Sequence, residues 1–250
     1  MKVLVCVKRV PDTGGGFKLT GDGQRVDTTN MDFTISPHEE CAVEEAIRLI
    51  EKHGGSSTVL TLGPEPAQEQ LREAIAKGMN GAILLEAPDY EAWDPAATAQ
   101  AIAEAAKPGA FEVLLFGNEC ADSCNYQVGL RVAHMLDIPC VTGVKSLEIQ
   151  GTKAIAMREV KSGREVYEVT LPAAFTVKEG LNSPRHPSLR GIMGAKKVPI
   201  EKKKLGKREP QLIRKLLRKP QEGRGQIEIL GNGADAAPKI VAKLRELGVL

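Results

Sequence analysis

Short apolar runs alternate with amphipathic stretches along the first 140 residues of this chain. Continuously apolar runs, typical of strands buried on both faces of a parallel sheet, occur at residues 3–7, 58–62, 82–85 and 113–116. Helical periodicity between and after these runs predicts helices over residues 37–53, 63–78, 95–106 and 126–136. The alternation predicts an α/β fold with a doubly wound, mainly parallel sheet, right-handed crossovers and helices on both faces.

The helix expected over residues 37–53 has a complete set of start and stop signals. Ser36 is suited to the N-cap and Pro37 to the first helical position, and Glu39 completes an S-x-x-E capping box. Gly54 follows the last apolar position and ends the helix. This segment therefore has the clearest sequence signature in the chain.

After residue 140 the pattern changes to alternating apolar and polar positions. Strands of an antiparallel meander are expected at residues 145–149, 153–159 and 164–171, with turns at Gly151 and Gly163. A buried strand at 173–177 and an amphipathic helix at 238–247 complete the expected elements. Between these two lies "NSPRHPSLRGIMGAKK" (182–197), whose two prolines and two glycines predict an irregular surface segment.

Composition places the chain among ordinary globular proteins. Its 250 residues are 42% hydrophobic and 26% charged, enough for a large α/β domain with extensions. The apolar run near the start has five residues, whereas a membrane span needs about 20, so we expect a cytoplasmic protein without direct membrane insertion. The five cysteines form no CxxC pair, and neither a disulfide framework nor a metal site is expected.

Positive charge is concentrated near the C-terminus. Residues 196–219 contain eleven Lys or Arg and two Glu, a local balance of +9 against +2 for the whole chain. A basic segment can bind nucleic acid, but this one contains no aromatic residue and no recognised nucleic-acid motif accompanies it. We therefore expect an extended, solvated or partner-facing arm and no nucleic-acid partner.

The expected sheet brings together residues that are suited to a phosphate-bearing ligand. Ligands of open parallel sheets bind beyond the carboxyl ends of the strands, where residues 6–8, 36–39, 62–63 and 117–129 are expected to meet. "GNECADSCNYQVG" (117–129) runs from a strand into a helix start, which offers free backbone N–H groups and a positive dipole end. We therefore favour a nucleotide over an apolar ligand.

Self-sufficient catalysis has no support in the sequence. There is no GxxxxGK[ST] loop, HExxH motif or GxSxG elbow, and the four histidines are scattered. "GNGADA" (231–236) matches GxGxxA, but too little chain follows it for a βαβ unit. We expect no catalytic residue and no metal site in this chain.

Several segments together resemble the β subunit of electron-transfer flavoproteins. They include "VLVCVKRVPD", "SPHEECAVEEAIRL", "LGPEPAQEQLREAIAKG", "REVKSGREVYEVTLPAAFTV" and "NSPRHPSLRGIMGAKK". The resemblance covers about residues 1–204, and its most specific part pairs "LPAAFTV" with the segment at 182–197. It implies a heterodimer whose α subunit holds most of an FAD, while an adenine-nucleotide-binding fold in this chain holds a structural AMP.

Carried over by position, the resemblance implies a nucleotide cradle. Its residues would be Cys6, Ser36, Pro37, His38, Glu39, Leu62, Gly117, Asn118, Glu119, Cys120, Ala121, Asp122, Ser123, Cys124, Asn125, Tyr126, Gln127 and Val128. These segments are the ones that sheet geometry had already selected. The resemblance names AMP, which the sheet geometry does not.

The resemblance also implies surfaces for electron-transfer partners. Leu189 would be the exposed anchor that docks flavin dehydrogenases such as acyl-CoA dehydrogenases, and Ile192 and Met193 would complete the docking segment. We expect the latter two to fold back onto the core. Thr13, which stands near a common aromatic position of the family, and Glu159 would face the mobile flavin domain. Electrons would pass on to an acceptor such as a membrane quinone oxidoreductase.

Two other functions remain open. An electron-bifurcating β subunit would bind a second FAD and NADH here, and "DSCNYQVG" (122–129) keeps Gln127, Val128 and Gly129 of its loop pattern. A stand-alone adenine-nucleotide-binding regulator would use the same fold without a flavin-bearing partner. The expected domain organisation has two parts. We expect one α/β domain over 1–195 that includes the docking loop 182–197. Residues 196–250 would be a basic arm and terminal helix that contact a partner subunit.

Overall fold

The computed structural model describes residues 1–12, 14, 16–219 and 227–250. These form two compact units, Met1–Lys215 and Leu216–Leu250, which are described separately. The first unit contains the whole α/β fold and the expected nucleotide cradle. The second contains the 3₁₀ segment Gly233–Ala236 and helix α6 (Ala237–Glu246).

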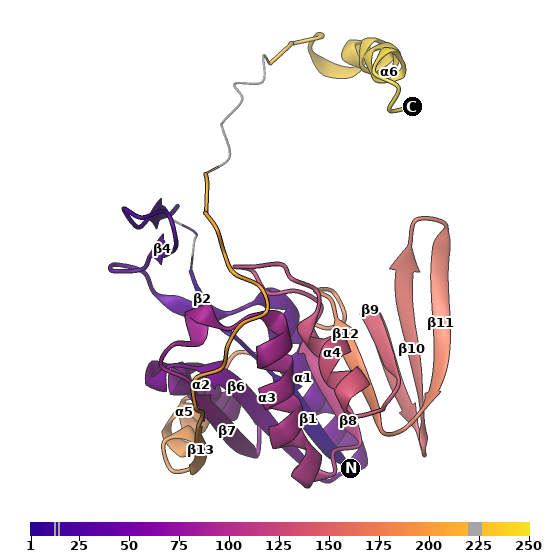
Figure 1. Ribbon diagram of the computed structural model, residues 1–250. Helices are drawn as coiled ribbons and strands as arrows, with labels where there is room; N and C mark the ends of the chain where they lie inside the picture. The colour runs from indigo at the N-terminus through magenta and orange to yellow at the C-terminus, as the bar shows by residue number, and fades with distance from the viewer. Residues whose placement is uncertain (13, 15, 220–226) are drawn as a thin grey trace. The chain divides into compact units, whose positions relative to one another are not determined.

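A nine-stranded sheet forms the centre of the first unit within the described chain (Figure 1). Its strands are β1 (Lys2–Cys6), β6 (Ser56–Gly63), β7 (Gly81–Glu86), β8 (Val113–Gly117), β9 (Cys140–Gln150), β10 (Lys153–Val160), β11 (Gly163–Thr170), β12 (Ala173–Val177) and β13 (Ile200–Lys204). The order is β11-β10-β9-β12-β8-β1-β6-β7-β13. Pairings from β9 across to β13 are parallel, while β9, β10 and β11 pair as an antiparallel meander. The predicted mixed architecture is confirmed.

Five helices accompany this sheet: α1 (Pro37–His53), α2 (Gln68–Lys77), α3 (Pro95–Ala106), α4 (Val128–Met135) and α5 (Leu189–Ala195). In the described residues, one core cluster joins α1 and α2 to the sheet and the other joins α3 and α4 to its opposite face (Figure 1). Strand β1 serves both clusters, because Val3 and Val5 point into the first and Leu4 and Cys6 into the second. Burial on both faces explains its continuous apolar sequence.

The strongest sequence signals give the most accurate boundaries. Helix α3 and strand β12 span the predicted residues, and α1 begins at Pro37 with the predicted capping box and ends before Gly54. Smaller elements were not predicted. Strands β2 (Arg9–Pro11) and β5 (Phe33–Ile35) pair with each other, as do β3 (Lys18–Leu19) and β4 (Val26–Asp27). Short 3₁₀ segments also occur at Glu65–Ala67, Tyr90–Ala92 and Lys107–Gly109.

The expectation of a wholly irregular segment at 182–197 is wrong. Its second half forms helix α5, because both prolines precede the helix and Ser188 caps its first turn. The Ser188 hydroxyl oxygen accepts a hydrogen bond from the Gly191 N–H at 3.0 Å. Capping by Ser supplies a partner for an otherwise free N–H group at a helix start.

The basic arm also differs from expectation at its beginning. Residues 200–204 are not an extended arm but strand β13, which pairs in parallel with β7 at the edge of the sheet. Ile200 and Lys203 are only partly exposed, whereas Glu201 is exposed and forms an ion pair with Lys203 at 3.2 Å. A charged strand at a sheet edge hinders edge-to-edge association with other chains.

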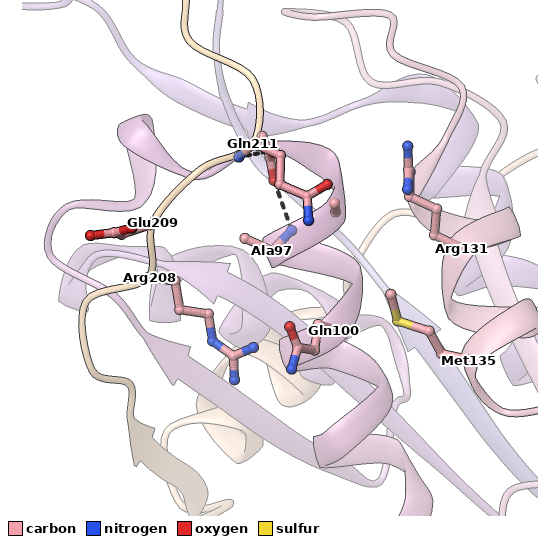
Figure 2. Close-up of a pocket in the computed structure, with 9 residues that line it drawn as sticks. Ala97, Gln100, Arg131, Met135, Arg208, Glu209 and Gln211 are labelled. Carbon is pink, nitrogen blue, oxygen red and sulfur yellow. Dashed lines mark hydrogen bonds between the residues drawn. The ribbon is translucent and has the colours of Figure 1, made fainter.

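Beyond β13, residues 205–215 form an extended strap that is fixed to α3 by one carboxylate. Asp94 Oδ1 accepts the Ala97 N–H at 2.8 Å, while Oδ2 accepts the N–H groups of Gln211 and Leu212 at 2.8 and 3.0 Å. The strap borders a groove of about 450 Å³ beside α3 and α4. Figure 2 shows Arg131 of α4 on one side of this groove and Gln211 on the other. Main-chain hydrogen bonds to Asp94 therefore hold the strap in place.

Candidate functional site

The predicted cradle segments meet at the carboxyl end of the parallel strands. The segment from β8 to α4 (residues 117–128, here called the β8–α4 loop) contacts the start of α1 through a hydrogen bond of 3.1 Å from the Ala121 N–H to Ser36 Oγ. The Lys8 N–H, just beyond β1, donates to Glu39 Oε2 at 3.0 Å. Leu62 lies near the end of β6, two residues after the register partner of Cys6. The fold therefore assembles three strand ends and a helix start at one edge.

Glu39 is the buried centre of this arrangement. Its side chain also accepts the Ser36 N–H at 3.4 Å, so one carboxylate joins the end of β1 to the start of α1. Burial raises the pKa of Glu39 to about 8, against the opposing effect of the Lys8 and Ser36 hydrogen bonds. Gly117 lies against it, because a Cβ at residue 117 would lie 2.7 Å from Glu39 Cγ. A glycine is needed for the loop to pass this close to α1.

The Lys8 ammonium is surrounded by the middle of the β8–α4 loop. Nζ lies 2.8 and 2.6 Å from the two carboxylate oxygens of Asp122, and 3.4 Å from the hydroxyl oxygen of Ser123. Cys120 Sγ is 4.0 Å from Nζ and 3.0 Å from Ser123 Oγ. Burial lowers the pKa of Lys8, but Cys120 and Asp122 outweigh this effect and leave it above its usual range.

Both ends of the β8–α4 loop are fixed by hydrogen bonds. At the start, the Asn118 N–H donates to the Val177 carbonyl at 2.9 Å, and the Thr176 hydroxyl donates to Asn118 Oδ1 at 2.8 Å. At the other end, Arg131 donates to Gln127 Oε1 at 3.1 Å from Nε and 3.0 Å from an Nη atom. The conformation between them is uncommon, since Cys124 and Tyr126 both have positive φ.

The junction between this loop and α4 is rich in free donors. Within the described residues, the N–H groups of Asn125, Tyr126 and Gln127 have no hydrogen-bond acceptor. They lie immediately before the first turn of α4, whose dipole is positive at that end. Free N–H groups beside a helix start suit a phosphate group, so the residues present fit the nucleotide implied by the resemblance.

Other predicted cradle residues lie around this centre. His38 is half-buried, and its Nδ1 lies 3.9 Å from Glu119 Oε1; burial lowers its pKa against the effect of Glu119. No hydrogen bond of His38 Nδ1 occurs in the described part of the chain, so this buried atom is available to a ligand. Cys6 is buried and its pKa is raised by burial, which keeps the thiol protonated and favours a packing role.

The arrangement can bind an anion but contains no assembled catalytic group. Burial raises the pKa of Cys120 as well, so the loop offers no activated thiolate. The described residues include no group of three His, Cys, Asp or Glu that could hold a metal ion. The geometry supports ligand binding.

Sequence reasoning missed the side-chain contacts that shape the loop. Lys8 was part of a converging segment, but its contacts with Asp122 and Ser123 join positions more than 110 residues apart. The only available signal was the position of Lys8 directly after a buried strand.

The two residues predicted to face the flavin domain lie outside this site. Thr13 lies outside the described residues, and Glu159 is exposed on β10 opposite Arg164 of β11.

The predicted docking residues lie on α5, near the end of the sheet that is formed by β7 and β13 (Figure 1). The side chain of Leu189 is 83% exposed and that of Met193 71%, so the expectation that Met193 folds onto the core is wrong. Ile192 is also exposed, at 43%, so the same expectation is wrong for this residue. The one-turn spacing of Leu189 and Met193 puts both on the outer side of this short helix.

Two arginines fix α5 to the body through four polar contacts. Arg72 of α2 donates to the carbonyl oxygens of Ala195 and Val198. Arg185, just before α5, makes ion pairs with Glu44 at 2.9 Å and Glu51 at 2.6 Å on α1. The outward apolar side chains therefore stand on a helix that is held in place.

Burial of Glu39 predicts a specific dependence of stability on pH. Its pKa is raised from 4.5 to about 8 in the folded chain, so the folded state retains a proton that the unfolded chain releases between these values. This contribution to the free energy of unfolding is fully present below pH 4.5 and is lost as pH rises through about 8. Glu39→Gln keeps an acceptor oxygen and does not titrate. We expect thermal denaturation to show a smaller loss of stability between about pH 5 and 8 in the variant.

Exposed Glu148 of β9 provides the control for this experiment. Glu148→Gln removes the same chemical group from a solvated position, and its denaturation temperatures should follow those of the unsubstituted protein at every pH. Parallel pH curves for Glu39→Gln and the unsubstituted protein would contradict the role assigned to Glu39.

Known proteins provide an independent comparison. Residues 25–207 match the family model described as the electron transfer flavoprotein domain. The chain is 38% identical to the protein of Bacillus subtilis (strain 168) named electron transfer flavoprotein subunit beta, over 98% of both chains. It is 35% identical to the protein of that name from Thermoanaerobacterium thermosaccharolyticum over 100% of both, and 39% identical to that from Syntrophomonas wolfei over 80% of this chain and 78% of the relative. The helices of the described residues include none that is long and apolar enough to cross a membrane.

Proposed function

This chain belongs to the electron transfer flavoprotein family, among its β subunits, and on that premise we propose that it acts in a heterodimer with an α subunit. The heterodimer would accept electrons from flavin dehydrogenases, such as acyl-CoA dehydrogenases, and deliver them to a quinone oxidoreductase or similar acceptor in the cytoplasm. FAD, held mainly by the α subunit, would supply the redox chemistry. This chain's own residues would bind a structural nucleotide and position partners.

AMP is the nucleotide that we propose for this chain. The observation that carries this proposal is the set of free N–H groups at Asn125, Tyr126 and Gln127, directly before α4. These groups would bind the phosphate, and the segments around Cys6, residues 36–39 and Leu62 would line the remainder of the site. The half-buried His38, whose Nδ1 makes no hydrogen bond in the described chain, would be available to polar atoms of the ligand.

The docking role is proposed for α5. Leu189 and Met193 are the most exposed apolar side chains of this helix, and its backbone is attached to α2 and α1 by Arg72 and Arg185. A fixed helix that presents apolar side chains loses little conformational entropy when a partner covers them. Transient association needs only a small interface of this kind.

Two further surfaces would face the α subunit. Glu159 is exposed near the tip of the meander and would face the mobile flavin domain. In the second compact unit, large apolar side chains are exposed at Ile227, Ile229, Leu247, Val249 and Leu250. Apolar side chains in this number favour a partner that covers them, and we assign that contact to the α subunit.

Counting cofactors tests the proposed function directly. The purified heterodimer, extracted with acid, should release one FAD and one AMP, because this chain has a single proposed nucleotide site. Two FAD and no AMP would replace the AMP proposal by the electron-bifurcating alternative. A protein that purifies without any flavin-bearing partner would instead support a stand-alone nucleotide-binding regulator.

A further inference from the structure

The ammonium of Lys8 occupies an unusual position for a strand-end lysine. It lies at the centre of the β8–α4 loop and within hydrogen-bonding distance of both Asp122 oxygens and of Ser123 Oγ. An ammonium has three protons to donate, and the loop provides three oxygen acceptors. The side chain is 34% exposed, so this group is enclosed by the loop on one side and accessible to solvent on the other.

The middle of the loop has few other attachments to the body of the protein. In the described residues these are the hydrogen bond from the Ala121 N–H to Ser36 Oγ and the 3.9 Å approach of His38 to Glu119. Cys124 and Tyr126, which follow directly, have φ values of 46° and 57°. Non-glycine residues remain in this region only when their surroundings hold them there.

The backbone of Lys8 is itself well fixed. Its N–H donates to the buried Glu39 carboxylate, and the preceding Val7 N–H donates to the Leu60 carbonyl at 2.9 Å. Lys8 therefore lies directly beyond β1, one of the most central strands of the sheet, and its backbone is fixed there. It can transmit that rigidity to the loop through Asp122.

We propose that Lys8 is a positioning residue, whose ion pair with Asp122 holds the β8–α4 loop in its nucleotide-binding conformation. The inference rests on the proposed nucleotide-binding role of this loop. Lys8 contributes by fixing where the N–H groups of residues 125–127 lie, and its protons are already directed to Asp122 and Ser123. Its effect on affinity is therefore exerted through Asp122 and the loop, without direct contact between the ammonium and the phosphate.

Amide hydrogen exchange on the nucleotide-free heterodimer tests the positioning step. Lys8→Met and Asp122→Asn should each accelerate exchange by at least about tenfold at the hydrogen-bonded N–H groups of Ala121 and Cys124. The double variant should exchange no faster than the more affected single variant, because both remove one ion pair. Lys8→Arg, which retains the charge, should restore part of the protection. This readout requires no assumption about which nucleotide binds.

Calorimetric binding of AMP and of adenosine to the nucleotide-free heterodimer tests the link to the ligand. Lys8→Met and Asp122→Asn should each weaken AMP by a similar factor, at least about tenfold, and adenosine by less, because the displaced N–H groups of residues 125–127 are the ones assigned to the phosphate. Lys52→Met is the matched control: it removes a positive charge from an exposed position in the last turn of α1, at the opposite end of that helix from the loop, where the described residues show no ion pair of Lys52. Both affinities should be unchanged in this control.

Two results would overturn the proposal. One is unchanged hydrogen exchange in both Lys8→Met and Asp122→Asn. The other is a loss of AMP binding in Lys8→Met while Asp122→Asn binds AMP as well as the unsubstituted protein or better, which would make Lys8 a phosphate ligand. If the unsubstituted protein bound FAD in place of AMP, the proposed function would fail, while the exchange experiment would still decide the role of Lys8.

Discussion

Leu189→Ala is expected to weaken docking of the flavin dehydrogenase by roughly ten- to more than hundredfold while the heterodimer and its flavin content stay intact. The Leu189 side chain is 83% exposed in the free chain, so truncation removes almost no internal packing. Burial of one leucine side chain in a partner contributes about 1.5–3 kcal/mol, and a single exposed anchor can dominate a small interface. Stopped-flow reduction of the flavin at limiting dehydrogenase concentrations measures the effect.

Val166→Ala is the control for loss of an exposed apolar side chain. Val166 is 66% exposed on β11, at the other end of the sheet, and its truncation should leave electron uptake unchanged. Unchanged kinetics for Leu189→Ala would reject the docking role of this residue. A heterodimer that unfolds at a much lower temperature in the Leu189→Ala variant would show a structural role instead.

Gly191→Ala should also impair docking, although residue 191 presents no side chain to a partner. A Cβ at this position would collide with the carbonyl oxygen of Ala76, in the backbone of α2. Backbone cannot yield as a flexible side chain can, so α5 must shift outward, at a cost of about 1–3 kcal/mol for overpacking. We expect at least about tenfold slower electron uptake, because a displacement of the helix misplaces Leu189 and Met193 together.

Gly194 of the same helix offers a matched control. A Cβ at residue 194 would meet no atom within 4 Å, and its φ is not in the left-handed region. Gly194→Ala should therefore leave electron uptake unchanged and stabilise α5 by roughly 0.5–1 kcal/mol through its higher helix propensity. Equal kinetics for the two alanine variants would show that the fit of α5 against α2 is unimportant for docking.

Hydrophobic periodicity predicted the elements that contribute most to the core. Strand β1 could be found because Val3 and Leu4 face opposite core clusters, which leaves no polar position in the run. Helix α1 could be found because its cap, first-turn proline and terminal glycine are local signals. Both cases depend on residues that are close in sequence.

The missed elements lack such local signals. Strands β2 to β5 have two or three residues each, too few to show a period of two. Strand β13 has the charged sequence of an edge strand, which resembles a solvated arm. Helix α5 was hidden by its two glycines and by the prolines before it, although Ser188 in front of Leu189 was a usable cap signal.

The candidate site was predictable at the level of segments. Parallel topology alone brings the ends of β1, β6 and β8 to one edge, and the loop after β8 leads into a helix. The internal shape of that loop was not predictable, because Cys124 and Tyr126 have positive φ and the contact with Lys8 joins residues 114 positions apart. Only long-range side-chain contacts fix such a conformation.

The attachment of α5 has an evolutionary consequence. Arg72 binds carbonyl oxygens at Ala195 and Val198, and Gly191 rests on the main chain of α2, so these anchors do not depend on the outward side chains. With the docking role proposed for α5, substitutions at Leu189, Arg190 or Met193 would alter which dehydrogenase is recognised at little cost to folding. Selection would then diversify partner choice on this helix while its placement is inherited unchanged, and one electron carrier would follow a changing set of donors.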